Sequence, residues 1–266
     1  MKRSVLMIIV LSICATSSFA EESGKVKTFF FTGGPIHDYR GIGDSVERAM
    51  NAYGRFDVTR FTSESPDTLE ADLDHFKAEN LEGYDLVVFY STLGTISEEQ
   101  KRGLMNFVAN GGGFATFHSG ADSFRGDPDY TNFVGGYFTG HPAYRPFQVS
   151  CVPNHPITEG MVEFITTDEQ YFVSYDERVN VIATSMWDGK LVPIAWTRPW
   201  GRGRVYYNSL GHDAAAVEND GFQRMFLRGA LWAAGEKNLD PAPDADVSTI
   251  FNQPHPEGRV DFVRHR

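Results

Sequence analysis

GGGFATFHSG, the stretch from Gly111 to Gly120, holds the pattern from which the fold is best inferred. Its three leading glycines end a helical pattern, and Phe114 to Phe117 form a short apolar run that predicts a buried strand. The strand leads directly into a tight, glycine-flanked turn at His118, where the nucleophile elbow of an α/β enzyme places its serine or cysteine. Imidazole is a poor acyl nucleophile but a good metal ligand or general acid–base, so the turn predicts chemistry other than acyl transfer.

Upstream of this stretch, apolar runs of strand length alternate with segments of helical periodicity. Ser97 is a good N-cap for the clearest of the helices. We expect strands at 26–32, 56–61 and 85–90, helices at 44–53 and 97–109, and a weakly helical segment at 67–76. Strands that are apolar on both faces and are joined by helices are typical of crossover units. The predicted fold class is therefore α/β, with an open parallel sheet and helices on both faces.

Downstream, the pattern changes between about 121 and 200, where glycine, proline and aromatic residues are frequent. Strand-like pieces at 147–152, 179–185 and 192–197 predict an irregular, partly antiparallel region that covers one end of the sheet. A strand at 204–210 and a helix at 222–234 then resume the earlier pattern. We therefore expect one α/β domain at 25–236 and an extended C-terminal tail at 237–266.

The first twenty residues have the three parts of a secretory signal peptide. Lys2 and Arg3 form the positive part, residues 5–13 form the apolar part, and the small residues Ser18 and Ala20 suit cleavage after Ala20. The apolar part is well short of the ~20 residues that a membrane span needs, which disfavours an anchor. We expect a periplasmic or secreted protein that has no membrane attachment after cleavage.

The charge of the chain excludes two classes of partner. The sequence has 24 basic and 35 acidic residues, a net charge of −11, and removal of Lys2 and Arg3 leaves 22 against 35, or −13. An acidic chain without a basic stripe is unsuited to nucleic acid or to an anionic membrane surface. Neutral partners such as sugars remain open. The aromatic content of 14% suits stacking on sugars, although ordinary core packing accounts for most of it.

His37, His118 and His212 each come just after the carboxyl end of a predicted strand. In an open parallel sheet these ends share one edge, and ligands bind there. Any one of the three histidines taken alone is better explained as an ordinary loop residue. Their shared topological position predicts that at least two of them belong to one site.

The carboxylate for this site is predicted in the irregular region. Glu169 lies in the segment DEQYF at 168–172, where it is either a solvated loop acid or, near the histidines, a metal ligand or a base with a raised pKa. We assign His118, His212 and Glu169 as ligands of one divalent metal ion, zinc or similar, and His118, Glu169 and His37 as catalytic residues. Additional candidates are His141, Asp38, Asp122, Asp213 and Tyr171.

Several short motifs together resemble the trehalose-utilisation (ThuA-like) family. The resemblance extends from Val26 to Ala234, and its motifs are His37-Asp38, the glycine-rich stretch with His118, Gly140-His141-Pro142, His155-Pro156, Asp168-Glu169 and Gly211-His212-Asp213. It implies a flavodoxin-like sheet within the class I glutamine-amidotransferase-like superfamily. It also implies a role in the metabolism of trehalose and related sugars, notably oxidised (3-keto) glycosides.

The resemblance to that superfamily fails at the decisive position. His118 stands where the amidotransferases have their cysteine nucleophile, so glutamine hydrolysis is not expected. His212 falls where the triad histidine of the amidotransferases would be. The resemblance therefore implies that the active-site position of that superfamily serves another reaction in this chain.

The sequence is compatible with three functions. The first is an enzyme that acts on a (keto-)glycoside or related sugar with a divalent metal, as a hydrolase, lyase or isomerase. The second performs such a reaction without metal, by acid–base chemistry of the histidines and Glu169. The third is a non-catalytic sugar-binding protein of the cell envelope. A small-molecule sugar is the expected partner in each, no nucleotide cofactor is predicted, and the oligomeric state is open.

Overall fold

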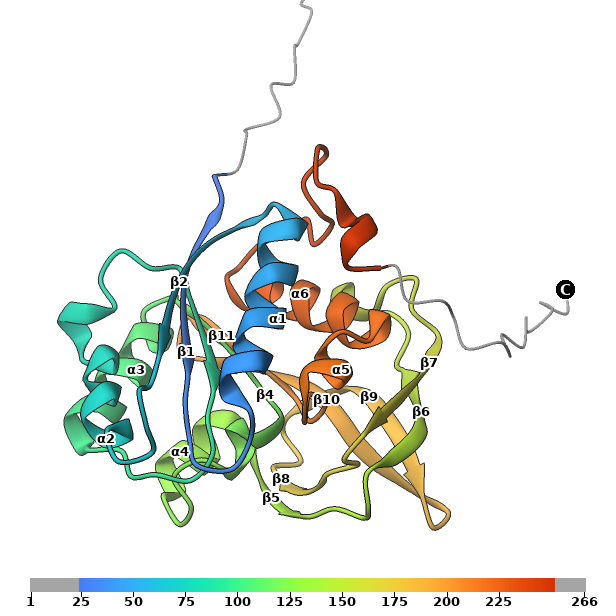
Figure 1. The fold of residues 1–266 in the computed structure, drawn as a ribbon, viewed down its shortest axis with the longest axis horizontal. Coiled ribbons are helices and arrows are strands. Elements are labelled where there is room, and N and C mark those ends of the chain that lie inside the picture. The colour runs from blue at the N-terminus through green and yellow to red at the C-terminus, as the bar shows by residue number, and fades with distance from the viewer. Residues whose placement is uncertain (1–23, 252–266) are drawn as a thin grey trace, which may run out of the picture.

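The structure, a computed structural model, describes residues 24–251, so the expected signal peptide and the end of the tail lie outside the described residues. Its centre is a nine-stranded sheet with the order β2-β1-β3-β4-β11-β10-β9-β6-β7, and β5 and β8 pair separately (Figure 1). The strands are β1 (Val26–Thr32), β2 (Phe56–Thr62), β3 (Leu86–Tyr90), β4 (Gly113–Phe117), β5 (Gly136–Gly140), β6 (Arg145–Cys151), β7 (Glu163–Asp168), β8 (Phe172–Tyr175), β9 (Asn180–Trp187), β10 (Lys190–Trp200) and β11 (Gly203–Asn208).

Helices connect the strands of the parallel half. The α-helices of the described residues are α1 (Tyr39–Tyr53), α2 (Leu69–Asp72), α3 (Glu98–Ala109), α4 (Pro128–Val134), α5 (Ala214–Val217) and α6 (Asp220–Ala233). Short 3-10 helices are η1 (Leu73–Phe76), η2 (Ala78–Asn80), η3 (His118–Asp122), η4 (Pro156–Thr158) and η5 (Val247–Thr249).

Five neighbouring strands, β2-β1-β3-β4-β11, run parallel to one another. Their arrangement is the flavodoxin-like order, in which the chain reverses its direction of winding between the first and third strands. The strands are buried on both faces: in β1, Phe30 packs into one core, and Phe29 and Phe31 pack into the other. The expected α/β fold class is therefore confirmed.

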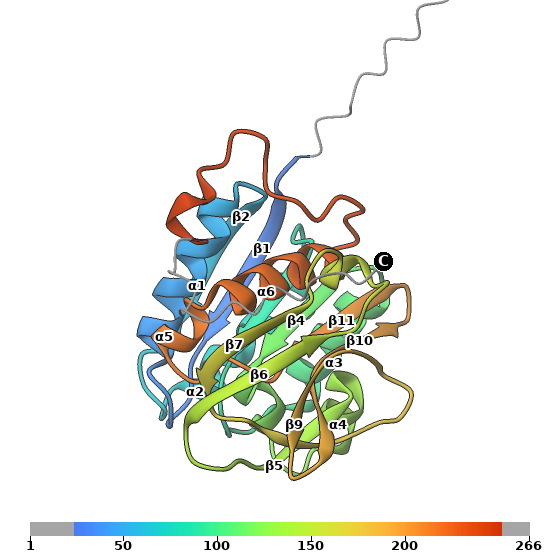
Figure 2. The same ribbon diagram turned by 90° about the vertical axis from the view of Figure 1, so that its right-hand side faces the viewer.

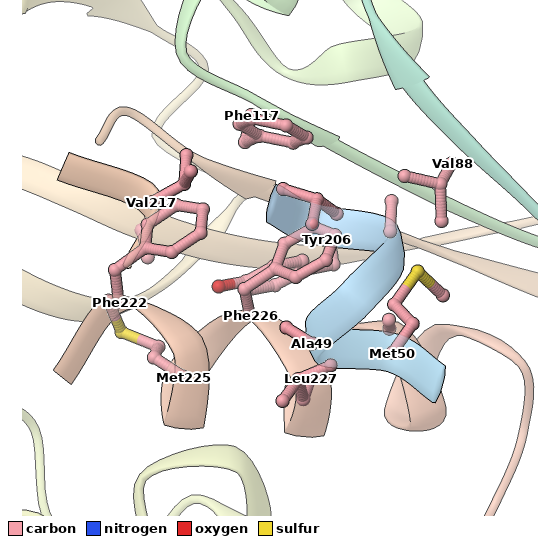
Figure 3. Close-up of a cluster of buried hydrophobic side chains, with 14 of the residues drawn as sticks. Ala49, Met50, Val88, Phe117, Tyr206, Val217, Phe222, Met225, Phe226 and Leu227 are labelled. Carbon is pink, nitrogen blue, oxygen red and sulfur yellow. The ribbon is translucent and has the colours of Figure 1, made fainter. Parts of the chain in front are cut away.

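The two cores correspond to two layers of helices. Helices α1, α5 and α6 cover one face of the sheet, and α2, α3 and α4 cover the other (Figure 1). In the first core, Met50 of α1 and the stacked rings of Phe222 and Phe226 of α6 lie against Val88 and Phe117 of the sheet (Figure 3). Burial of such aromatic and aliphatic side chains is the main stabilising contribution to the fold.

The irregular region between about 121 and 200 is placed differently from our expectation. Most of its strands extend the sheet sideways instead of covering its end: β10 pairs antiparallel with β11, and β9, β6 and β7 follow. The physical reason is that β11 would otherwise leave an open edge of unpaired backbone groups. Figure 2 shows β6 and β7 on the side of the molecule that faces the viewer. Only β5 and β8, with α4, lie near the end of the parallel strands.

Two helix starts illustrate what local sequence does and does not reveal. The start predicted at Ser97 is confirmed, because Ser97 and Gln100 form a reciprocal capping box. The helix predicted at 44–53 begins at Tyr39 instead, where the Asp38 carboxylate caps it by accepting the Gly41 N–H. Gly43 weakens the helical signal in the sequence but allows α1 to pack closely on the sheet, because a β-carbon there would lie 3.1 Å from Thr32 of β1.

The described part of the tail packs against α1. The Tyr53 hydroxyl donates a 2.7 Å hydrogen bond to the Leu239 carbonyl, and Leu239 and Ile250 are buried. Among residues 24–251, no helix combines the length and the apolar character that crossing a membrane requires.

Candidate functional site

The carboxyl ends of three parallel strands bring the predicted histidines together. His37 follows β1, His118 follows β4, and His212 follows β11. Glu169 reaches the same place from the loop after β7, and one ligand atom from each of the four residues lies within 4.8 Å of the others. We call these four residues the His/Glu cluster. Its members come from four separate segments, and parallel topology explains why three of the four meet.

His118 is held in a strained backbone conformation with φ of +45°. The Tyr207 hydroxyl fixes this turn by donating a 3.0 Å hydrogen bond to the His118 carbonyl. The His118 ring is fully buried, and its Nδ1 donates to the Ser209 carbonyl at 3.0 Å. A carbonyl can only accept, so Nδ1 carries a proton, and Nε2 is the ring nitrogen that faces the cluster.

The two oxygens of Glu169 face different partners. Oε2 lies 3.1 Å from His212 Nδ1 and 3.5 Å from His118 Nε2. Oε1 lies 3.4 Å from His141 Nε2, on the outer side of the cluster. Glu169 is 13% exposed, whereas His212 and His141 are 30% and 33% exposed, so the cluster meets solvent through these two rings.

His118 Nε2 and His212 Nδ1 are both buried and have no hydrogen-bond partner with correct geometry among the described residues. Buried polar atoms without partners are uncommon and call for an explanation. Two imidazole nitrogens facing one carboxylate oxygen form a place where a cation is favourable. Three imidazoles and a carboxylate are a donor set that suits a divalent first-row metal ion, so the residues present fit the expected metal.

The ionisation of Glu169 bears on the alternatives that the sequence left open. A base whose pKa is raised was one of them, beside a metal ligand and a solvated loop acid. Burial does act in that direction, but the neighbouring His118 and His212 rings outweigh it and hold the pKa of Glu169 well below its usual range. Reciprocally, the Glu169 carboxylate 3.1 Å away raises the pKa of His212. Glu169 is therefore a carboxylate at neutral pH.

His37 is kept neutral by its surroundings. Its Nδ1 is hydrogen bonded to the Thr92 hydroxyl at 3.0 Å, which leaves Nε2 as the nitrogen for a ligand. Burial, with repulsion from the His118 and His212 rings, lowers the pKa of His37 from 6.5 to about 3. A neutral imidazole is the form that ligates a metal or accepts a proton.

The depressed pKa of His37 predicts a loss of stability in acid. Between pH 6.5 and about 3 the unfolded chain binds a proton at His37 and the native protein does not, so stability falls as pH falls through this window. We therefore compare the free energy of unfolding of metal-free protein, measured with urea, at pH 6.5 and pH 4. Its fall between these two pH values should be smaller in His37→Gln than in the wild type by about 2 kcal/mol. Parallel curves for the variant and the wild type would contradict the assignment.

Asp168, adjacent to Glu169, fastens two loops of the cluster to each other. Its carboxylate is fully buried and accepts backbone N–H groups from Glu169 at 2.8 Å, Gly211 at 2.7 Å and His212 at 3.2 Å. Sequence analysis did not select Asp168. The sequence signal that could have identified it is the pair of adjacent acids Asp168 and Glu169, because only one of two adjacent side chains can face the histidines. Thr92 was missed because it is not titratable, although it follows β3 at the same sheet edge.

The additional candidates divide into two groups. His141 contacts Glu169, and the buried ring of Tyr171 lies 4.0 Å from the His118 ring, so both adjoin the cluster. The other three engage partners outside it. Asp38 and Asp213 cap the amino ends of α1 and α5, and Asp122 holds Arg125 through two hydrogen bonds of 2.6 and 2.7 Å.

Aromatic rings border the cluster. Phe138 and Tyr171 lie 4.3 Å apart between centroids, and the Tyr144 ring lies 5.4 Å from His212. Tyr144 is 41% exposed, so one of its faces is accessible. Aromatic faces next to polar ligands are a common arrangement where sugars bind, since one face of a sugar ring is apolar.

Comparisons with known proteins agree with this fold. The sequence model of the family described as ThuA, trehalose utilisation, matches residues 27–233. Among solved structures, a ThuA-like protein from Parabacteroides merdae has 22% identity and a TM-score of 0.73, over 83% of this chain and 94% of that one. A ThuA-like protein from Bacteroides uniformis has 18% identity and a TM-score of 0.61, over 82% and 94% of the two chains.

A third similar structure is a β-galactosidase from Rahnella sp. R3, with 17% identity and a TM-score of 0.57. The match covers 79% of this chain but 31% of that enzyme. At such identities the solved structures establish the fold and nothing further. No curated protein matches the chain.

Proposed function

Because the chain belongs to the trehalose-utilisation (ThuA) family, whose description supports a role in carbohydrate metabolism, we propose that it is a metal-dependent enzyme acting on a glycoside or an oxidised (3-keto) glycoside. The reaction is a hydrolysis, elimination or isomerisation beside a sugar carbonyl or hydroxyl. The observation that carries this proposal is the His/Glu cluster, with two buried imidazole nitrogens that lack a hydrogen-bond partner among residues 24–251.

His37, His118, Glu169 and His212 would hold the metal ion. The buried ring of His118 is oriented by the Ser209 carbonyl, and His37 is oriented by Thr92. Such outer partners fix the tautomer and direction of a ligating imidazole. When bound, a divalent ion supplies Lewis-acid polarisation of a sugar oxygen.

The side chains around the cluster would bind and orient the sugar. His141 presents a partly exposed ring beside Glu169, where it would contact the substrate. Tyr144 offers an accessible aromatic face next to His212. Tyr171 closes the inner side of His118 against water, because its ring is buried between His118 and Phe138.

Metal content is the measurement that tests the proposal. Purified protein is expected to contain about one divalent ion per chain, following the mononuclear pattern of such ligand sets. Chelation should abolish turnover of a 3-keto disaccharide, and the same ion added back should restore it. Full activity of chelated, metal-free protein would contradict the metal mechanism.

A metal-free acid–base mechanism is the second candidate. The 3.1 Å contact between Glu169 and His212, with the raised pKa of His212, favours it. In this mechanism Glu169, facing Nδ1, stabilises the protonated His212 ring, and the other ring nitrogen, Nε2, would give its proton to the leaving oxygen. Chelation separates the two mechanisms, because only the metal-dependent one loses activity. If the protein binds sugars but turns none of them over, the result supports the third function, a non-catalytic sugar-binding protein of the cell envelope.

We further propose that the protein acts outside the cytoplasm. The support is the three-part pattern of the first twenty residues, with cleavage after Ala20. Protein exported by a bacterial host is expected to begin at Glu21, as read by N-terminal sequencing. Soluble protein that retains Met1 would contradict the localisation.

A further inference from the structure

Arg145 and Trp187 lie at the same sheet edge as the His/Glu cluster. Arg145 is the first residue of β6 and Trp187 is the last residue of β9. Two neighbours link Arg145 to the cluster: the ring of Tyr144, the preceding residue, lies 5.4 Å from the His212 ring, and Asp168, the residue before Glu169, pairs with Arg145 across β6 and β7.

The Arg145 guanidinium is held in one orientation from two sides. Its central carbon lies 4.6 Å from the centre of the Trp187 ring. One terminal nitrogen lies 3.4 Å from Gln170 Oε1, a long contact. Gln170 is itself fully buried and fixed, because its amide nitrogen donates to the Ser185 hydroxyl at 2.7 Å. A stacked and oriented guanidinium loses little entropy when it binds a ligand.

Arg145 also has unused binding capacity. Its Nε is buried without a hydrogen-bond partner in the described part of the chain, and no carboxylate of residues 24–251 forms an ion pair with it. This is notable in a chain with 35 acidic and 24 basic residues. Asp168, which pairs with Arg145 across β6 and β7, is engaged by backbone N–H groups. A partly buried cation with an unpaired donor is unfavourable until an anion joins it.

We propose that Arg145, supported by Trp187, binds a carboxylate of the substrate, so that the cluster acts on acidic sugars in preference to neutral ones. The planar fork of a guanidinium matches the two oxygens of a carboxylate. This inference rests on the proposed function, because it assigns a substrate class to the same site.

A matched pair of sugars tests it. Methyl β-D-glucuronide and methyl β-D-glucoside differ only at C6, where the first has a carboxylate and the second a hydroxymethyl group, and their binding to the metal-loaded protein is measured by calorimetry. We expect the glucuronide to bind at least ~10-fold more tightly, as charge-assisted hydrogen bonds allow. Arg145→Gln should remove this preference and leave the affinity for the glucoside unchanged, and Arg145→Lys should retain part of it.

Arg204 provides the matched control. It stacks on Trp232 at 5.0 Å in the same way, but at the amino end of β11, away from the cluster. Arg204→Gln should keep the preference for the glucuronide. Equal affinity of wild-type protein for the two sugars, or a preference that survives in a folded Arg145→Gln variant, overturns the inference and leaves the proposed function standing. Failure of both sugars to bind metal-containing protein that still turns over a 3-keto disaccharide also overturns the inference and leaves the proposed function standing.

Discussion

His118→Ala protein is expected to fold and to lose most of its bound metal and its turnover. His118 is the fully buried member of the cluster, and its Nε2 lies between Glu169 and the other imidazoles. Changes to outer partners of metal ligands alone cost ~10–100-fold in metal affinity or activity, so loss of a ligand should exceed ~100-fold. The backbone at His118 already has a positive φ, and alanine adopts it with similar strain.

The His118→Ala experiment needs a histidine control and two readouts. Metal content after dialysis reports the site, and circular dichroism reports the fold. His155→Ala is the matched control, because His155 lies at η4 beside Trp232, outside the cluster. The control should retain metal and turnover. A folded His118→Ala variant with undiminished metal and activity would refute both the metal site and the catalytic assignment.

Asp168→Asn is expected to have the second largest effect, although Asp168 ligates nothing. The amide places an N–H₂ group opposite backbone N–H groups, so the hydrogen bonds to Gly211, or to Glu169 and His212, are lost. Loss of hydrogen bonds to a buried charged acceptor should lower the free energy of unfolding by about 2–4 kcal/mol. Metal affinity should fall ~10–100-fold, because two ligand-bearing loops lose their common anchor.

Asp122→Asn is the control that separates an effect of Asp168 on the position of the metal ligands from a general effect on protein stability. Asp122 is also a buried carboxylate near the carboxyl end of β4, and it holds Arg125 through two hydrogen bonds. Its replacement should lower stability in urea unfolding and leave metal affinity near that of wild type. If Asp168→Asn binds metal as tightly as Asp122→Asn does, Asp168 is a structural residue without a role in the site.

The parallel core was predictable because each of its signals is local. The apolar run at 26–32 matches β1, and the Ser97 cap is read from residues within one turn. The antiparallel half was less predictable. Whether strands such as β7 pair with the open edge of β11 or cover the end of the sheet depends on contacts between distant segments, which periodicity does not report.

For the site, the sequence by itself determined that His37, His118 and His212 converge, because the carboxyl ends of parallel strands share one edge. Tertiary structure alone decided how Glu169 and Asp168 divide their roles, since adjacent side chains after a strand point in different directions. It also decided the ionisation of Glu169. The sequence left open whether Glu169 is solvated or buried, and the imidazoles within 3.5 Å that outweigh its burial are set by packing between segments far apart in the chain.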